Sequence, residues 1–202
     1  MTKQYSLISY TAKLGKGVII GDFSQIKNCI IGDNTTIGNR CDIYGGTIIG
    51  KDVKIWHSCN IYGCSIGDNT QIGTFNEIKQ GATVGEFCRF QCGVFIPEET
   101  KIGNYVFLGP HVLITNDKHP TAMNAIKKTW NLEAVIIEDH ASIGAGAILN
   151  PGIKIGKHAI VGSGALVTKD ILDYHIVVGA PAKKVGDKRE HKNFAIDYEN
   201  SI

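Results

Sequence analysis

One segment of this sequence, residues 115–134, carries side chains suited to acid–base chemistry. It reads TNDKHPTAMNAIKKTWNLEA and holds Asn116, Asp117, His119 and Trp130. An ordinary imidazole titrates near neutral pH, so His119 is a candidate general base. A solvated loop histidine is the alternative interpretation. A long polar segment without regular structure is usually a functional loop, which favours a role for these side chains.

The six cysteines do not form a recognisable redox or metal site. They stand at positions 29, 41, 59, 64, 88 and 92, with no C-x-x-C pair and no histidine at zinc-finger distance. Zinc sites and redox pairs depend on such spacings. We therefore expect reduced, buried thiols and no metal.

A period of six residues runs through most of the chain and predicts its fold. From Ile8 to Val167 it meets an apolar residue at 25 positions, with two steps of five and one break across residues 115–134. Gly follows 13 of these positions, which marks a recurring turn. A strand repeats every two residues and a helix about every 3.6, so a period of six fits one short strand and one corner. Such units are stable only when stacked, so we expect a β-solenoid.

A second column of small or β-branched side chains follows four residues after most of the apolar positions. Cys41, Cys59 and Cys88 occupy this column, which supports a packing role for the thiols. Asn76 interrupts it. A buried amide has to be hydrogen-bonded, so Asn76 either caps an internal ladder or presents its polar end to a ligand.

Composition excludes several classes of protein. With 202 residues and 43% apolar content, the chain can form a continuous core, so it is not disordered. Its formal charge of +2 gives no argument for binding nucleic acid or an anionic membrane. No stretch reaches the roughly 18 apolar residues that span a bilayer, and the start MTKQYS lacks the apolar region of a signal peptide. We therefore expect a cytoplasmic protein.

The pattern I-G-x-x-T/V/C-x resembles the hexapeptide-repeat acyltransferases over about residues 6–181. The resemblance implies an all-β fold, a left-handed parallel β-helix of about eight coils with three hexads per coil. The handedness comes from the family, because parallel crossovers are usually right-handed. The acyltransferase domain would span residues 1–181, with an excursion loop over 115–134. For the tail, residues 182–202, we expect a short helix lying on the coils.

Two short sequence motifs favour one branch of this family. I-G-T-F-N-E-I-K at 72–79 and T-N-D-x-x-P at 115–120 resemble acetyltransferases that act on nucleotide-linked 3-amino sugars. The substrate contacts that this resemblance implies are Asn76, Glu77, Asn116, Asp117 and Trp130. His119 stands in an H-P pair like that of galactoside and maltose acetyltransferases, where the histidine is the catalytic base. In some nucleotide-sugar relatives the acceptor amine is thought to act without such a base, so His119 is either the base or a substrate contact.

The C-terminal coils resemble the coenzyme A end of the family. Their run of small residues, such as I-G-A-G-A and V-G-S-G-A, is followed by G-A-P-A-K at 179–183. The resemblance implies that the pantetheine of acetyl-CoA lies against backbone there, with lysines near the adenosine phosphates. Crowded turns alone would also favour small residues. The cofactor-binding residues implied are Gly144, Ala145, Gly162, Ser163, Lys169, Pro181, Lys183 and Lys184.

These features predict an N-acetyltransferase that moves the acetyl group of acetyl-CoA to the amine of a UDP- or dTDP-linked 3-amino sugar. We expect it to act in surface polysaccharide (lipopolysaccharide) biosynthesis as a homotrimer. The alternatives are an O-acetyltransferase for a small hydroxyl acceptor and a non-catalytic hexapeptide scaffold. His119 and the run of small residues that resembles the family's coenzyme A site argue against the scaffold. The fold also houses γ-carbonic anhydrases, but His57, His111 and His119 lack their H-x4-H spacing, so we expect no zinc enzyme.

Overall fold

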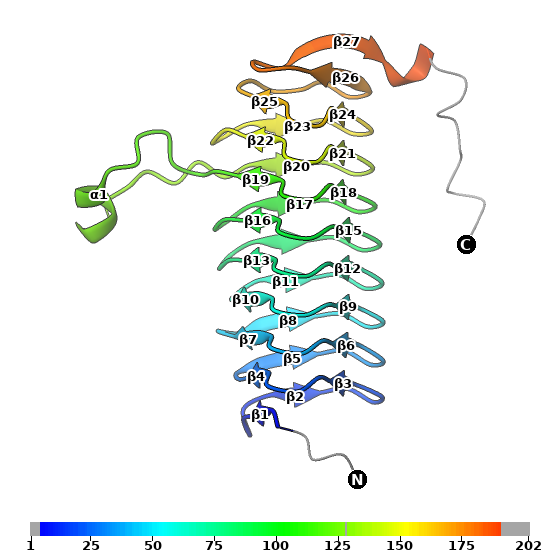
Figure 1. The fold of residues 1–202 in the computed structure, drawn as a ribbon, viewed down its shortest axis with the longest axis vertical. Coiled ribbons are helices and arrows are strands. Elements are labelled where there is room, and N and C mark those ends of the chain that lie inside the picture. Colours follow the sequence, from blue (N-terminus) through cyan, green and yellow to red (C-terminus); the bar gives the residue numbers. More distant parts are fainter. Residues whose placement is uncertain (1–4, 128, 191–202) are drawn as a thin grey trace.

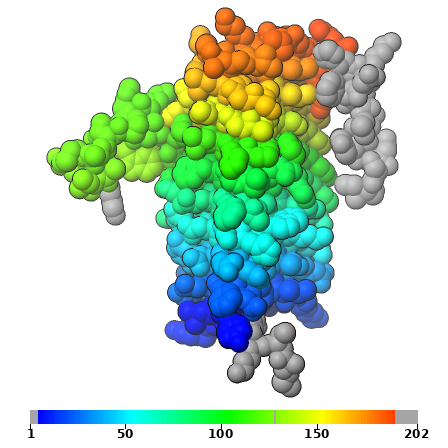
Figure 2. Space-filling model, in the orientation of Figure 1, coloured from blue at the N-terminus to red at the C-terminus, as the bar shows by residue number. Residues whose placement is uncertain are grey.

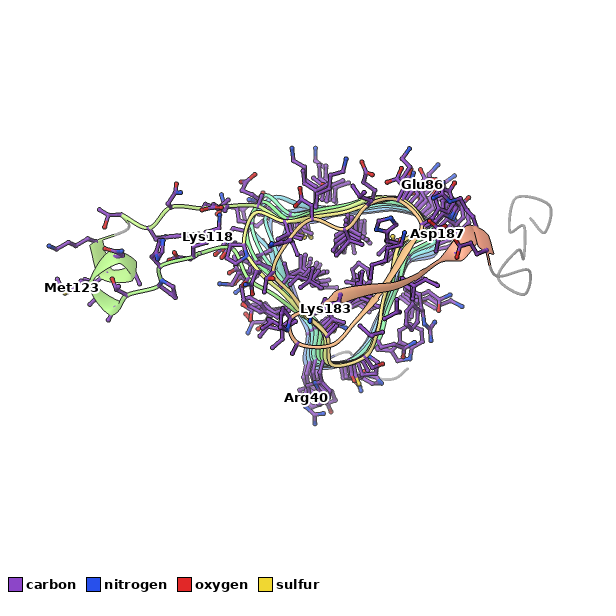
Figure 3. The ribbon with its side chains drawn as sticks, turned by 90° about the horizontal axis from the view of Figure 1, so that it is seen from above. Arg40, Glu86, Lys118, Met123, Lys183 and Asp187 are labelled. Carbon is purple, nitrogen blue, oxygen red and sulfur yellow. The ribbon has the colours of Figure 1, made fainter. Side chains whose placement is uncertain are left out.

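The computed structural model describes residues 5–127 and 129–190. The chain forms a tower of short strands, almost all of which pair in parallel with the third strand along the chain (Figure 1). The strands make three sheets, here called A, B and C, around a triangular cross-section (Figure 3). The predicted left-handed parallel β-helix is confirmed.

Each sheet forms one side of the triangle. Sheet A has nine strands, which are β1 (Leu7–Ile8), β4 (Gln25–Ile26), β7 (Asp42–Tyr44), β10 (Asn60–Tyr62), β13 (Glu77–Ile78), β16 (Phe95–Ile96), β19 (Leu113–Ile114), β22 (Ile148–Leu149) and β25 (Leu166–Val167). Sheet B has eight, which are β2 (Lys13–Leu14), β5 (Cys29–Ile31), β8 (Thr47–Ile49), β11 (Ser65–Ile66), β14 (Thr83–Val84), β17 (Lys101–Ile102), β20 (Ile136–Ile137) and β23 (Lys154–Ile155). Sheet C has ten, which are β3 (Ile19–Ile20), β6 (Thr36–Ile37), β9 (Lys54–Ile55), β12 (Gln71–Ile72), β15 (Arg89–Phe90), β18 (Phe107–Leu108), β21 (Ser142–Ile143), β24 (Ile160–Val161), β26 (His175–Val178) and β27 (Lys183–Asp187).

The solenoid has about nine turns, whereas the hexad count predicted about eight. The additional turn follows Val167, where the chain takes a step of four residues to Ile171 and then a step of six to Val177. Ile171 bridges to Ile155, and Val177 pairs with Val161, so both complete the core. The short step breaks the period, which is why the hexad count missed this turn.

The apolar hexad positions form the core of the tower. From Ile26 to Val167 every one of them is buried. In the first coil Ile8 and Leu14 are 37% and 40% exposed because no described coil lies beneath them. A buried side chain of this size contributes about 1.5–3 kcal/mol. Stacking therefore stabilises strands that are only two or three residues long.

The second inward column is hydrogen-bonded from coil to coil. Thr70 Oγ1 donates to the carbonyl of Gly85 at 2.9 Å and accepts from the N–H of Cys88 at 3.0 Å. Cys59 Sγ makes the corresponding bond to the carbonyl of Gly73 at 3.1 Å. Burial raises the pKa of the Cys88 thiol to about 11. All six cysteines are free; five are buried, as expected, and Cys92 is half-buried. In the described part of the chain no cluster of side chains could hold a metal ion.

One corner of the triangle carries a continuous stack of rings. We call it the ladder corner; it joins sheets B and C near Glu86 (Figure 3). Its rings belong to Phe87, Tyr105, His140, His158 and Tyr174, with neighbouring centroids 4.5–5.1 Å apart. Arg189 caps the stack, 5.0 Å above the Tyr174 ring. All five ring-bearing residues have positive φ, so the same turn conformation repeats in each coil.

The C-terminal tail differs from the predicted helix. Lys183–Asp187 forms β27, antiparallel to β26, and crosses the top of the triangle (Figure 3). The last edge of sheet C offers unpaired backbone groups, and an extended segment satisfies them. Lys188–Glu190 makes one turn of 3₁₀ helix, and residues 191–202 lie outside the described residues. Among the helices of the described part, none is long and apolar enough to cross a membrane.

Candidate functional site

An arm over residues 115–134 leaves the tower after β19 and returns before β20 (Figure 1). It projects from the corner between sheets A and B, here called the arm corner, and stands clear of the body (Figures 2 and 3). Its helix α1 (Ala122–Lys127) buries no side chain, and Met123 and Ile126 are 54% and 74% exposed. The segment lacks the hexad phase, so the solenoid core has no place for it.

The predicted chemical residues of the arm are spread along it. His119 lies exposed on the outgoing half, where its backbone N–H donates to Asp117 Oδ1 at 2.8 Å. This turn fixes the backbone direction at the H-P pair. Trp130 is half-buried on the returning half. Asn116 lies at the neck, where the arm joins the tower. The arm therefore presents His119 to solvent, away from the chain's own core.

A polar network holds the neck. Asn116 Nδ2 donates to Glu98 Oε2 at 3.1 Å, and Glu98 Oε1 pairs with Lys79 Nζ at 3.3 Å. The carbonyl of Asn116 accepts from the N–H of Glu133 at 2.9 Å, and the Glu133 carboxylate pairs with Lys118. Lys79, Glu98 and Glu133 were not predicted from the sequence. A separation of about one coil could have indicated the first two, because Lys79 and Glu98 are 19 residues apart and Glu98 and Asn116 are 18 apart.

Lys79 and Glu98 stabilise each other's charge. Burial alone would raise the pKa of Glu98, but its own backbone N–H, the Asn116 amide and the Lys79 ammonium together hold it below its usual value. Burial alone would lower the pKa of Lys79, but Glu98 holds it above its usual value. Glu98 is thus ionised at neutral pH and acts as a hydrogen-bond acceptor.

The prediction that Asn76 contacts the substrate is wrong, because the residue lies in the core. It is 2% exposed. Its Nδ2 donates to the carbonyls of Gly73 and Gln91 at 2.7 and 2.9 Å, and its Oδ1 accepts from the N–H of Val94 at 2.8 Å. The amide therefore caps the internal ladder, which was one of the two alternatives. Glu77 lies on the outer face of β13, half-buried, and stays a candidate contact.

The corner between sheets C and A gathers most of the predicted cofactor residues. We call it the small-residue corner. Ala145 and Ser163 are exposed there in successive coils. The turn that contains Pro181 lies above them. The N–H of Leu166 donates to the carbonyl of Gly179 at 3.0 Å, and the carbonyl of Leu166 accepts from the N–H of Ala182 at 2.8 Å. Lys183 follows this turn at the start of β27 (Figure 3).

The glycines of this corner fall into two groups. A Cβ at Gly144 would lie 2.4 Å from the Ser163 nitrogen, and one at Gly162 would lie 2.7 Å from Val178 Cγ1. Close stacking of the coils thus accounts for both glycines, which we had expected to bind the cofactor. A Cβ at Gly146 or Gly164 would meet nothing within 4 Å.

Backbone conformation does not explain why positions 146 and 164 are glycine. Both have positive φ, but Arg40, Phe75 and His111 occupy the same turn position in lower coils with φ of 57–60°. A side chain is therefore tolerated at this position. The upper coils leave it bare, and the small-residue corner is open there.

Two predicted cofactor residues lie elsewhere. Lys169 is exposed on the arm corner, after β25. Lys184 Nζ lies 4.0 Å from Asp187 Oδ2, at the end of β27. The arm corner and the small-residue corner lie at opposite edges of sheet A (Figure 3). A single chain therefore does not bring His119 and the open corner together.

Two protein-family models match the chain. The GMPPB C-terminal domain matches residues 10–74, and the bacterial transferase hexapeptide (six repeats) matches residues 134–169. Galactoside O-acetyltransferase from Lactococcus lactis is 35% identical over 108 residues, 51% of this chain and 52% of that protein. The chain spans about half the length of the curated relatives it matches. The resemblance to hexapeptide-repeat acyltransferases is confirmed.

Solved structures share the fold over most of the chain. UDP-N-acetylglucosamine acyltransferase from Campylobacter jejuni superimposes with a TM-score of 0.80 at 17% identity, covering 96% of this chain and 78% of that one. A hexapeptide-repeat acetyltransferase from Vibrio cholerae, solved with acetyl coenzyme A, has a TM-score of 0.55 at 20% identity, covering 62% and 70%. At these identities the likeness shows the fold alone.

Proposed function

We propose that this hexapeptide-repeat protein is an acetyl-CoA-dependent acetyltransferase. The observation that carries the proposal is the open stretch of the small-residue corner at Gly146 and Gly164, where an added Cβ would meet nothing within 4 Å. In lower coils this turn position is held by the large residues Arg40, Phe75 and His111 and by the small residues Ser58 and Gly93. An extended thioester cosubstrate needs a surface without side chains. The fold shared with an acetyltransferase solved with acetyl coenzyme A supports acetyl-CoA as the cosubstrate.

The acceptor we propose is the amine of a nucleotide-linked 3-amino sugar. The motifs I-G-T-F-N-E-I-K and T-N-D-x-x-P favour this acceptor. Since Asn76 is in the core, the outward-facing residue of the first motif is Glu77, whose carboxylate can accept hydrogen bonds from a sugar. The match to a galactoside O-acetyltransferase supports the alternative, a hydroxyl acceptor. The amino sugar would place the protein in the cytoplasmic synthesis of surface polysaccharide.

Acetyl transfer to an amine requires two proton transfers. It forms a carbon–nitrogen bond and breaks the thioester carbon–sulfur bond, so the acceptor ammonium loses one proton to solvent before attack and a second during transfer, and the departing sulfur gains one. His119 is exposed and can exchange protons with solvent. It would accept a proton from the attacking amine and pass it to the thiolate.

The active form we propose is a homotrimer with sites between subunits. Phe95, Leu113, Ile148 and Leu166 form a continuous apolar column on the outer face of sheet A. This face lies between the arm corner and the small-residue corner. A second copy packed on it would cover the column and bring the arm of one chain to the open corner of its neighbour. Contact with that neighbour would also cover Met123 and Ile126.

The decisive experiment follows release of free coenzyme A with acetyl-CoA and a panel of UDP- and dTDP-linked 3-amino sugars. Each sugar is paired with its 3-hydroxy analogue. Turnover with an amino sugar at least about tenfold above its hydroxyl analogue is expected. Preference for the hydroxyl analogues would replace the amine acceptor by the alternative, and no release with any acceptor would remove the acetyltransferase proposal.

A further inference from the structure

The neck network at the base of the arm has no part in the acetyl-transfer steps above. Glu98 lies one coil below the point where the arm leaves the tower, and its carboxylate is bonded on both sides. One oxygen faces Lys79 at 3.3 Å and the other faces the Asn116 amide at 3.1 Å. The Glu98 and Lys79 side chains are only 28% and 24% exposed, so solvent competes weakly for these bonds.

Asn116 links the Glu98 carboxylate to the part of the arm that carries His119. Its carbonyl accepts from Glu133 N–H at 2.9 Å, which joins the outgoing and returning halves. The next residue, Asp117, accepts the N–H of His119 at 2.8 Å. Two hydrogen bonds, joined by the peptide bond between Asn116 and Asp117, therefore connect Glu98 to the backbone of His119.

The arm has few other anchors on the tower. Helix α1 buries no side chain. At the neck, the N–H and the hydroxyl of Thr115 both donate to the carbonyl of Leu149 at 3.0 Å, and the N–H of Gly152 donates to the carbonyl of Glu133 at 3.0 Å. Asn116 Nδ2 also reaches the backbone carbonyl of Glu98, at 3.4 Å. These bonds hold the ends of the arm in place. The side-chain bond to Glu98 fixes the direction in which it leaves.

We infer that Glu98 is a positioning residue, which aims the arm through Asn116 so that His119 reaches the acceptor. This inference rests on the proposed acetyltransferase function. Lys79 keeps the Glu98 carboxylate charged and lies 5.3 Å above the Phe95 ring. Phe95 belongs to the apolar column. The direction of the arm is therefore coupled to the outer face of sheet A, on which the neighbouring subunit would pack.

The test combines amide hydrogen exchange with kinetics on the full-length protein. In Glu98→Ala we expect exchange across residues 115–134 to rise roughly tenfold while β13, β16 and β22 keep their protection. We expect kcat to fall roughly tenfold or more, with the KM for acetyl-CoA within about twofold of wild type, because the small-residue corner is untouched. Glu86→Gln is the control, since it removes an exposed corner carboxylate far from the arm (Figure 3).

The double variant Glu98→Ala/Asn116→Ala tests the link itself. If Glu98 acts through Asn116, the double variant exchanges no faster in the arm than either single variant. Independent, additive increases would overturn the inference, as would an arm unchanged in Glu98→Ala or a loss of protection that spreads through the coils. The exchange measurement needs no substrate. Failure of the wild-type protein to release coenzyme A would therefore count against the proposed function without deciding the role of Glu98.

Discussion

His119 is the arm residue whose chemistry can be tested most directly. If it takes the proton of the attacking amine, His119→Ala should lower turnover by roughly 10²–10⁴ and abolish the neutral-range ionisation in the pH profile. His119→Asn separates the two roles, because it keeps a side chain of similar reach but cannot accept a proton near neutral pH. Near-normal turnover in His119→Asn would remove the general-base role and leave a substrate contact.

The hydrogen bonds of the buried Asn76 amide predict that its removal destabilises the fold. Asn76→Ala leaves the N–H of Val94 and the carbonyl of Gln91 without a partner in the core, whereas the carbonyl of Gly73 keeps its bond from Cys59 Sγ. We expect the free energy of unfolding to fall by about 2–4 kcal/mol, because buried polar groups without partners are costly. Denaturant titration measures this loss.

Asn76→Thr is the matched control for that loss. Thr70 makes the same kind of coil-to-coil bonds from the same inward column. A threonine at position 76 should therefore recover part of the lost stability. An alanine variant as stable as wild type would show that the amide does not support the ladder.

At the scale of the structural element, the open stretch of the small-residue corner predicts a kinetic effect. Ala145 is exposed beside Gly146. Ala145→Trp should raise the KM for acetyl-CoA by roughly tenfold or more, because the indole would fill the bare corner. Asp22→Trp changes the corresponding turn in the first coil and is the control. Unchanged acetyl-CoA kinetics in Ala145→Trp, with the fold intact, would remove this corner as the cosubstrate site.

The ring stack at the ladder corner predicts a pH dependence of stability. Burial, the neighbouring His140 and Lys188 lower the pKa of His158, while Asp139 and Asp173 oppose the shift. Between its lowered folded pKa and the ordinary value of 6.5, the unfolded chain binds more protons than the folded chain. Stability from this group is therefore present above pH 6.5 and is lost as the pH falls through the window.

Replacing the imidazole by an aromatic ring that does not titrate isolates this contribution. Phe87 occupies the same corner with a φ of 55°, so His158→Phe keeps both the stack and the turn. Between about pH 7.5 and pH 5.5 the melting temperature should fall less in His158→Phe than in wild type. Equal slopes in the two proteins would exclude His158 as a source of acid sensitivity.

For the whole molecule, the apolar column of sheet A predicts the oligomeric state. Light scattering at about micromolar concentration should give the mass of three chains, and Ile148→Asp should shift it toward one because a carboxylate would be buried in the interface. Ile136→Asp is the matched control, since Ile136 on sheet B is 39% exposed and Ile148 is 38% exposed. A wild-type mass of one chain would contradict the trimer, and equal effects of the two variants would contradict the face.

The sequence by itself determined the repeating unit and most of the core. Inward Ile, Leu and Val positions recur at a fixed spacing because strand and corner are local structures, so the columns from Ile26 to Val167 could be assigned without coordinates. The break over residues 115–134 identified the arm for the same reason. The packing role of Cys59 and Cys88 also followed from their place in the second column.

Only the tertiary structure decided which residues meet between coils. Asn104 and Asp139 are bonded although 35 residues apart, because the arm lies between them in the sequence. The bond from Glu98 to Asn116, the inward turn of the Asn76 amide and the separation of Lys169 from Lys183 likewise depend on which corner of the triangle each residue occupies. The period shows that coils stack, but the steps of four and five residues set their register, and register determines which side chains face one another.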